Sequence, residues 1–244
     1  MAWSRELPDS SVRAWIAGRR VAMPLLAGAL AGSSMIAPAA AQTGDRALAS
    51  PAAITGRDTH SRTLYLSLIE NMRASGQVHA ALAHLDAFDT QFPRSDEAAI
   101  LRGNCLVDIA DYPGAGAVFQ RLVRGRHAAE AFAGLGRIEA LNERWPAAVA
   151  HYARAVQRAP TQPLYLSDYG FALLRAGKPA DAVFRLRQAV ELAPADTRAR
   201  NNLILALAAA GDEPAARRVL ATVDDPTQRS DIETELANTT KRAR

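Results

Sequence analysis

Residues 129–162 (AEAFAGLGRIEALNERWPAAVAHYARAVQRAPTQ) and 163–196 (PLYLSDYGFALLRAGKPADAVFRLRQAVELAPAD) are two consecutive copies of one 34-residue pattern. Seven slots coincide at this spacing: Phe132, Leu135, Gly136, Ala148, Tyr152, Ala155 and Pro160 in the first copy, and Leu166, Tyr169, Gly170, Ala182, Leu186, Ala189 and Pro194 in the second. Self-similarity at a fixed period of this size is typical of solenoid proteins, in which one supersecondary unit stacks on the next.

The order of large residue, glycine, alanine and final proline at this period resembles the tetratricopeptide repeat (TPR), a helix–turn–helix unit. The resemblance implies an all-α fold, an α-α superhelix of about five such units. The composition agrees with this expectation, because aromatic residues make up only 6% of the chain while alanine is abundant. Alanine has the highest helix propensity and allows helices to approach closely.

Aligning outward from this pair predicts five repeats, at residues 62–95, 96–128, 129–162, 163–196 and 197–230. The second copy has 33 residues and carries His127 where proline usually stands. We expect turns between the paired helices at Gly76 and Gly211, and helix-capping side chains at Thr161 and Asp196. Residues 231–244 are expected to form a short helix that covers the open end of the last repeat, followed by a solvated tail.

The first 41 residues predict a cleavable export signal. Arg19 and Arg20 precede an apolar run at residues 21–36, and residues 39–41 offer a cleavage site of small residues. The alternative is an uncleaved anchor, but the run contains Pro24 and is shorter than the roughly 20 residues of a spanning helix. Since no cysteine lies near the cleavage site, we expect a periplasmic or secreted, non-lipidated mature chain without a stable membrane span.

Residues 42–61 mix glycine, serine, proline and isolated charges without helical periodicity, which predicts a flexible linker. The formal net charge of the whole chain is +4. Residues 1–41 contribute four arginines against Glu6 and Asp9, a net +2, and so leave +2 for the rest. This weak charge argues against a nucleic-acid-binding function.

Residue types that carry catalysis or bind metals do not converge in the sequence. No two of the histidines His60, His79, His84, His127 and His151 have the i, i+4 spacing that places two ligands on one helical face. Phosphate-binding glycine loops and zinc motifs are also missing from the sequence. Cys105 is the only cysteine, so no internal disulfide can form, and we expect it to be a small core residue. The sequence therefore predicts a non-enzyme without cofactor or metal.

The predicted functional surface is the concave groove that one face of each first helix lines in TPR proteins. Transferring the groove positions of the family to this sequence selects Glu70, Asn104, Arg137, Leu141, Phe171, Leu174, Arg175, Arg198, Asn201, Asn202 and Leu205, with Arg73 and Asp108 beside them. Phe171, Leu174 and Leu205 would form an apolar floor. Arg137, Arg175 and Arg198 would form a basic rim. Such a groove suits an extended or helical peptide with an acidic group.

The alternative is that these positions are ordinary solvated helix faces. The lysine-and-asparagine clamp by which chaperone-type TPR proteins bind a C-terminal carboxylate is not matched, because Ala133 stands where its first lysine would be. This departure argues against recognition of a C-terminal carboxylate.

The expected leader, the five repeats and the runs at 169–177 (YGFALLRAG) and 198–203 (RARNNL) together resemble the TadD branch of bacterial TPR proteins. Proteins of that branch assist assembly of Flp (tight-adherence) pili. The resemblance implies a scaffold or assembly chaperone for protein partners of a pilus or secretion system. The alternative is a structural envelope protein that self-associates or coordinates cell-wall or outer-membrane assembly enzymes.

Overall fold

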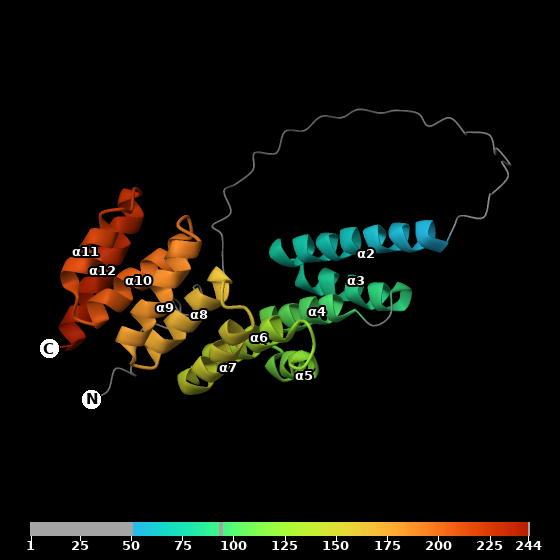
Figure 1. Cartoon of the computed structure of the whole chain (residues 1–244), viewed down its shortest axis with the longest axis horizontal. Helices are drawn as coiled ribbons and strands as arrows, with labels where there is room; N and C mark the ends of the chain where they lie inside the picture. Colours follow the sequence, from blue (N-terminus) through green and yellow to red (C-terminus); the bar gives the residue numbers. More distant parts are fainter. Residues whose placement is uncertain (1–50, 93–94, 244) are drawn as a thin grey trace, which may run out of the picture.

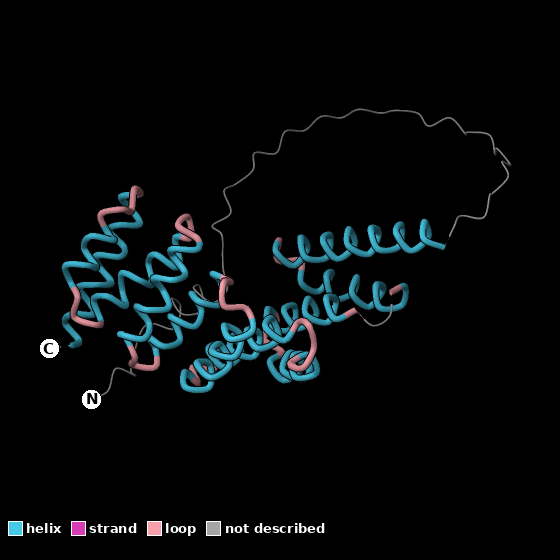
Figure 2. The backbone as a smooth tube through the Cα atoms, viewed as in Figure 1, coloured by secondary structure: helices cyan, strands magenta, loops and turns pink. Residues whose placement is uncertain are grey.

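The computed structural model describes residues 51–92 and 95–243, and it confirms the all-α fold class. The expected signal at 1–41 and residues 42–50 of the expected linker lie outside this part. The described residues form eleven helices, α2 to α12, and no strand. Figure 1 shows the helices stacked in chain order along the long axis, from α2 at one end to α11 and α12 at the other, and Figure 2 shows the short loops between them.

Each of the five expected repeats contains one antiparallel pair of helices. The pairs are α2 (Pro51–Ala74) with α3 (Val78–Gln91), α4 (Asp96–Asp108) with α5 (Tyr112–Leu122), α6 (Ala128–Leu141) with α7 (Trp145–Arg158), α8 (Pro163–Arg175) with α9 (Pro179–Leu192), and α10 (Thr197–Ala209) with α11 (Glu213–Leu220). The last helix, α12 (Pro226–Ala243), packs against α10.

The turn inside every repeat has the same backbone geometry. One residue with positive φ follows each first helix: Gly76 (81°), Ala110 (63°), Glu143 (57°), Gly177 (75°) and Gly211 (84°). The next N–H then donates to the carbonyl five residues earlier, as from Gln77 to Met72 and from Lys178 to Leu173. This Schellman arrangement satisfies carbonyls at the helix end and reverses the chain. These positive-φ residues are 34 residues apart, except that Ala110 and Glu143 are 33 apart. Helix α5, which lies between those two turns, has 11 residues, whereas α3, α7 and α9 have 14 each.

The paired helices approach closely where a glycine on the first faces a large side chain on the second. Within one repeat, Gly136 lies against Tyr152, and Gly170 lies against Leu186. A Cβ atom at Gly170 would stand 2.5 Å from the Leu186 side chain, so any larger residue would collide there. Alanines on the second helices occupy a further tight slot: Ala81, Ala115, Ala148, Ala182 and Ala216 are each at most 2% exposed. The packing pattern of the sequence is therefore repeated along the whole stack.

Two expected boundaries are wrong. Helix α2 begins at Pro51 rather than near residue 62, so residues 51–61 are not an irregular linker. Proline is well suited to the first turn of a helix, because its φ is already helical and its missing N–H has no partner to lose there. Helix α12 likewise begins with a proline, at Pro226 rather than at residue 231. The side chain of Asp225 accepts a hydrogen bond from the N–H of Thr227 in the first turn of that helix.

The two expected capping residues have different outcomes. Asp196 caps α10, because its Oδ1 accepts hydrogen bonds from the N–H groups of Arg198 and Ala199. Thr161 does not cap α8: the capping position is Gln162, and its side chain makes no capping hydrogen bond. The proline at the first position of α8 makes a capping side chain less necessary, since one of the N–H groups that would need it is missing.

Candidate functional site

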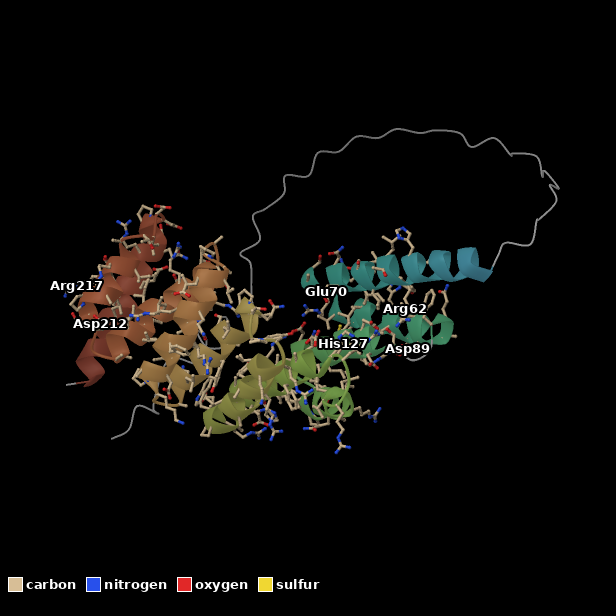
Figure 3. The ribbon with its side chains drawn as sticks, in the orientation of Figure 1. Arg62, Glu70, Asp89, His127, Asp212 and Arg217 are labelled. Carbon is tan, nitrogen blue, oxygen red and sulfur yellow. The ribbon has the colours of Figure 1, made fainter. Side chains whose placement is uncertain are left out.

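All of the predicted groove residues lie on the first helices of the repeats, α2, α4, α6, α8 and α10, and we call the surface that these helices form together the inner face. Successive first helices are in contact, from α2 to α4 to α6 and again from α8 to α10. Side chains of different repeats can therefore act together on this face. Figure 3 shows how Arg62, Glu70 and His127 project from the N-terminal half.

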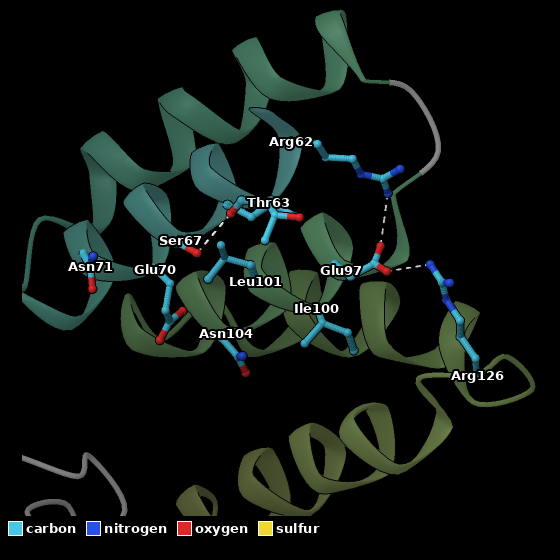
Figure 4. A pocket seen from close by; sticks show the side chains of 11 residues that line it. Arg62, Thr63, Ser67, Glu70, Asn71, Glu97, Ile100, Leu101, Asn104 and Arg126 are labelled. Carbon is cyan, nitrogen blue, oxygen red and sulfur yellow. Dashed lines mark hydrogen bonds and ion pairs between the residues drawn. The ribbon is translucent and has the colours of Figure 1, made fainter. Parts of the chain in front are cut away.

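A pocket of about 740 Å³ opens between α2 and α4, and we call it the α2–α4 pocket. Its lining consists of Arg62, Thr63, Leu66, Ser67, Glu70, Asn71, Glu97, Ile100, Leu101, Asn104 and Arg126. Figure 4 shows Ile100, Leu101 and Asn104 projecting from α4 below α2, with charged side chains at one end. The predicted residues Glu70 and Asn104 thus meet in one concave site.

Glu97 is the centre of the charged end of this pocket. Its carboxylate lies 3.1 Å from the guanidinium of Arg62 and 2.5 Å from that of Arg126 (Figure 4). His127 Nε2 is 3.5 Å from the same carboxylate. Burial by itself would raise the pKa of Glu97. Hydrogen bonds from the backbone and Ser95, together with the two arginines, outweigh that effect and lower the pKa. Glu97 is therefore a fixed negative charge that joins α2, α4 and the loop before α6.

A second set of ion pairs crosses three repeats on the inner face, and we call it the Asp108 network. Arg73 lies 2.6 Å from Glu70 on its own helix and 2.7 Å from Asp108 on α4. The carboxylate of Asp108 also accepts a hydrogen bond of 2.8 Å from the guanidinium of Arg137 on α6. The hydrogen bond to Glu70, followed by that to Asp108, raises the pKa of Arg73. Opposite charges in this network compensate one another.

The C-terminal half of the inner face has a different character. Arg198 on α10 lies 3.1 Å from Asp168 on α8, and burial raises the pKa of that aspartate. The guanidinium of Arg175 stacks 4.7 Å above the ring of Trp145. Phe171 meets the same Trp145 edge-on, with ring centroids 5.9 Å apart. Asn202 on α10 is only 2% exposed.

These contacts correct the expected chemistry of the groove. Phe171 and Leu174 are 6% and 7% exposed, so they belong to the packed core rather than to an open apolar floor. Leu141 and Leu205 are partly buried against neighbouring core clusters. Arg137 and Arg198 each face an aspartate, which compensates their charge, and Arg175 stacks over an aromatic ring. A preference for an acidic peptide therefore has no support in Arg137 and Arg198.

The α2–α4 pocket adds two half-buried apolar residues that were not among the predicted site residues, Leu66 and Ile100. Arg62, Glu97 and Arg126 were also not among the predicted site residues. The repeat register could have found most of these residues. Leu66 and Ile100 occupy the repeat position of Asn201 in the last repeat, and Glu97 occupies that of Arg198. Arg126 precedes α6, where the shortened second repeat breaks that register.

The described residues offer little to covalent or metal chemistry. Cys105 is fully buried, and burial raises the pKa of its thiol to about 11, so it is a core residue with almost no thiolate at neutral pH. Over residues 51–92 and 95–243, histidine, cysteine and carboxylate side chains form no group of three that could hold a metal ion. None of the described helices is both long enough and apolar enough to cross a membrane.

Sequence comparison finds two matching family models, both described as tetratricopeptide repeat. One matches residues 72–127 and 122–163, and the other matches residues 173–234. A relative from Pseudomonas aeruginosa, TPR repeat-containing protein PA4299, is 31% identical in an alignment of 180 residues that covers 69% of this chain and 71% of that protein.

Solved structures share the fold at low sequence identity. The thermophilic TPR protein TTC0263 of Thermus thermophilus has a TM-score of 0.59 at 17% identity and covers 73% of this chain and 98% of its own. Pseudomonas aeruginosa PilF has a TM-score of 0.62 at 16% identity, and the match covers 76% of this chain and 86% of PilF. YrrB, described as a TPR protein with an unusual peptide-binding site, has a TM-score of 0.50 at 20% identity. That match covers 78% of this chain and 97% of YrrB. At such identities these likenesses show the fold alone.

Proposed function

Because the chain belongs to the tetratricopeptide-repeat family, whose members are generally protein-interaction scaffolds, we propose that it is a non-enzymatic scaffold or assembly chaperone of the bacterial envelope. Its inner face holds a segment of a partner protein. The observation that carries this proposal is the α2–α4 pocket, a concave site of about 740 Å³ on that face.

The lining of the pocket suits a segment of protein. Leu66 and Ile100 provide apolar surface, while Ser67 and Asn104 provide hydrogen-bonding groups. Peptide-binding grooves usually combine apolar surface for side chains with hydrogen-bonding groups. Arg62 and Arg126 share the single carboxylate of Glu97, which leaves the charged end of the pocket weakly positive and suited to polar or acidic side chains of the partner.

The proposed compartment is the periplasm, on the strength of the basic leader, the apolar run at 21–36 and the small residues at 39–41. Mass spectrometry of the protein recovered from the envelope fraction is the direct test. A mature N-terminus near residue 42 is expected. An intact Met1 would overturn the export proposal.

The proposed partner is a component of a Flp pilus or a related secretion system, on the strength of the resemblance of residues 169–177 and 198–203 to the TadD branch. Site-specific photo-crosslinking in cells can identify it. A photoreactive residue at Ser67, which is exposed and lines the pocket, should form a defined adduct. The matched control is the exposed Arg187 on α9, which lies outside the inner face and should form none.

The identity of the adduct decides between functions. A pilus or secretion component supports the proposal, and a cell-wall or outer-membrane assembly enzyme supports the structural envelope alternative. If Ser67 and Arg187 give the same adducts, or none, the inner face has no role in binding.

A further inference from the structure

The N-terminal end of the stack lacks the kind of helix that covers every later first helix. Helices α4, α6, α8 and α10 each contact the second helix of the repeat before them. Helix α2 is the first of the described helices, so it has no such neighbour among them. Figure 1 shows α2 at the edge of the stack, above α3 and α4. One side of α2 therefore has no helix packed on it in this part of the chain.

The residues on this side of α2 occupy repeat positions that are buried in all later repeats. Leu64 is 57% exposed, and Asn71 is exposed as well. The residues at the repeat position of Leu64 are at most 9% exposed in the other four repeats: Ala98, Ala131, Tyr165 and Ala199. Those at the position of Asn71 are at most 6% exposed: Cys105, Ile138, Ala172 and Ala206. In the second repeat the cover is α3, whose Leu85 shares a core cluster with Ala98 and Cys105.

We call Ser61, Leu64, Leu68 and Asn71 the α2 end face. Their spacing of three, four and three residues places them along one side of a helix, and Leu68 is also 50% exposed. The exposed residues of α2 from 60 to 74 include no aspartate, glutamate, lysine or arginine: His60, Ser61, Thr63, Leu64, Ser67, Leu68, Asn71 and Ala74. An uncharged helix side with two exposed leucines is better suited to contact with another helix than with water.

The mature chain is too short to cover this face with its own N-terminus. After the proposed cleavage near residue 42, only residues 42–50 remain before Pro51. Two antiparallel helices need a connection of roughly 2–5 residues. The remainder would form at most about two helical turns, which would lie beside the start of α2 and end well short of Leu64. The cover must therefore come from another chain.

A second copy of this chain has the properties that such a cover requires. A two-fold interface places the same patch of both copies in contact, so charged residues near its axis would meet like charges. The exposed side of α2 from 60 to 74 has none. Helix α2 also has 24 residues against 14 in α3, so a pair of α2 helices extends over about 36 Å.

The other end of the stack cannot take the place of this second α2. Helix α12 closes it, and Asp231 and Glu233 lie on the exposed side of that helix. Copies of the chain therefore meet at their N-terminal ends, which gives a closed dimer rather than a filament.

We propose that two copies of the chain pair through their α2 helices, with Leu64 and Leu68 of each copy packed against α2 of the other. This interface goes beyond the proposed scaffold function, which needs only one copy. Because Asn71 also lines the α2–α4 pocket, the dimer carries its two pockets close to the interface.

Sedimentation of the exported protein tests the pairing. The protein should be a dimer with a dissociation constant of about 10 µM or lower. Leu64→Glu and Leu68→Glu should each raise that constant at least roughly tenfold, because like charges then meet across the two-fold axis. Leu192→Glu is the matched control, since Leu192 is a 48% exposed leucine on α9, and it should leave the dimer unchanged. Circular dichroism checks that each variant is folded.

A crosslinking measurement does not depend on destabilising the dimer. Leu68→Cys introduces one accessible thiol, since Cys105 is fully buried. A short bismaleimide, added to the exported protein and to cells, should join two copies of the chain through Cys at position 68. Leu192→Cys is the control and should give no such adduct. Mass spectrometry identifies the joined chains.

Three outcomes would overturn the inference. One is a wild-type protein that is still a monomer at about 100 µM, whether α2 is bare or covered by an uncleaved leader. Another is a dimer that Leu64→Glu and Leu68→Glu leave intact. The third is a Leu68→Cys adduct with a different protein instead of a second copy. Each of these leaves the proposed scaffold function standing, because crosslinking from Ser67 tests partner binding separately.

Discussion

Phe119 on α5 shows how single residues determine the spacing of the repeats. It is fully buried between two glycines, Gly103 of its own repeat and Gly134 of the next. A Cβ atom at Gly103 would lie 2.6 Å from the Phe119 ring, and one at Gly134 would lie 2.5 Å from it. Both distances are far inside van der Waals contact, so the aromatic ring fits only because both positions lack a side chain.

We therefore expect Gly134→Ala to lower the free energy of unfolding by about 1–3 kcal/mol, because a buried ring cannot move aside without disturbing the core. Urea denaturation followed by circular dichroism measures the change. Gly116→Ala is the matched control. Gly116 lies within α5 and has no heavy atom within 4 Å of the added Cβ. The better helix propensity of alanine should raise stability there by roughly 0.5–1 kcal/mol. Equal effects at the two sites would contradict this packing.

The repeat pattern of the sequence marked Gly136 as a packing residue, and the structure shows Gly136 and the nearby Gly134 both buried in helix contacts. It did not predict that Gly134 faces the ring of the preceding repeat. That contact depends on how two repeats stack, which a pattern within one repeat does not specify.

At the scale of elements, the turn between paired helices is the most regular feature of the chain. Gly76, Gly177 and Gly211 adopt positive φ without steric cost, whereas Ala110 and Glu143 adopt the same geometry with a Cβ atom. The common geometry persists in all five repeats because the helix packing on both sides requires the reversal.

We expect Ala110→Gly to stabilise the protein by about 0.5–1 kcal/mol, because relief of the left-handed strain exceeds the added entropy of the unfolded glycine. Gly177→Ala, the reverse change at an equivalent turn, should destabilise it by about 1 kcal/mol. Chemical denaturation of the two variants beside the wild type checks both signs. Destabilisation by Ala110→Gly would show that its Cβ makes a contact worth more than the strain.

Helix α12 is the element that closes the C-terminal end of the stack. Ile232 is 7% exposed and packs in one cluster with Leu207, Leu220 and Val223. The open face of a terminal repeat needs such a cover, since its apolar residues would otherwise meet water.

Ile232→Ala should therefore lower the free energy of unfolding by roughly 2 kcal/mol or more, through lost apolar contact and a residual cavity. Glu233→Ala, at the exposed neighbouring position, should change it by less than about 0.5 kcal/mol. Hydrogen exchange of α10 amides gives a second readout, because α12 covers that helix. If exchange in α10 does not change in Ile232→Ala, α12 is not a functional cap.

At the scale of the whole molecule, each repeat touches mainly its neighbours, so stability depends on contacts between repeats. The Asp108 network is such a contact, because one carboxylate binds arginines from α2 and α6. Side chains of Arg73, Asp108 and Arg137 are only 19–23% exposed, which weakens screening by solvent.

Asp108→Asn should accordingly lower the free energy of unfolding by about 1–2 kcal/mol at low salt, with a smaller loss near 1 M NaCl. The control is Glu213→Gln, which breaks an exposed pair with Arg217 whose side chains are 49% and 78% exposed. That change should cost at most about 0.5 kcal/mol. A salt-independent loss in Asp108→Asn would point to packing rather than charge.

The sequence by itself determined the architecture, because a 34-residue period of small and large residues can bury its apolar stripes only by stacking helix pairs. It located the five helix pairs and the shortened second repeat. It also selected Glu70 and Asn104, which lie in the α2–α4 pocket, from their positions in the repeat.

Only the tertiary structure decided the chemistry of the inner face. Whether Arg137 and Arg198 are a basic rim depends on Asp108 and Asp168, which reach them from neighbouring helices 29–30 residues away. Whether Phe171 is a floor or a core residue depends on Trp145, a residue of the preceding repeat. Charge compensation and burial arise between repeats, and a pattern within one repeat contains no information about them.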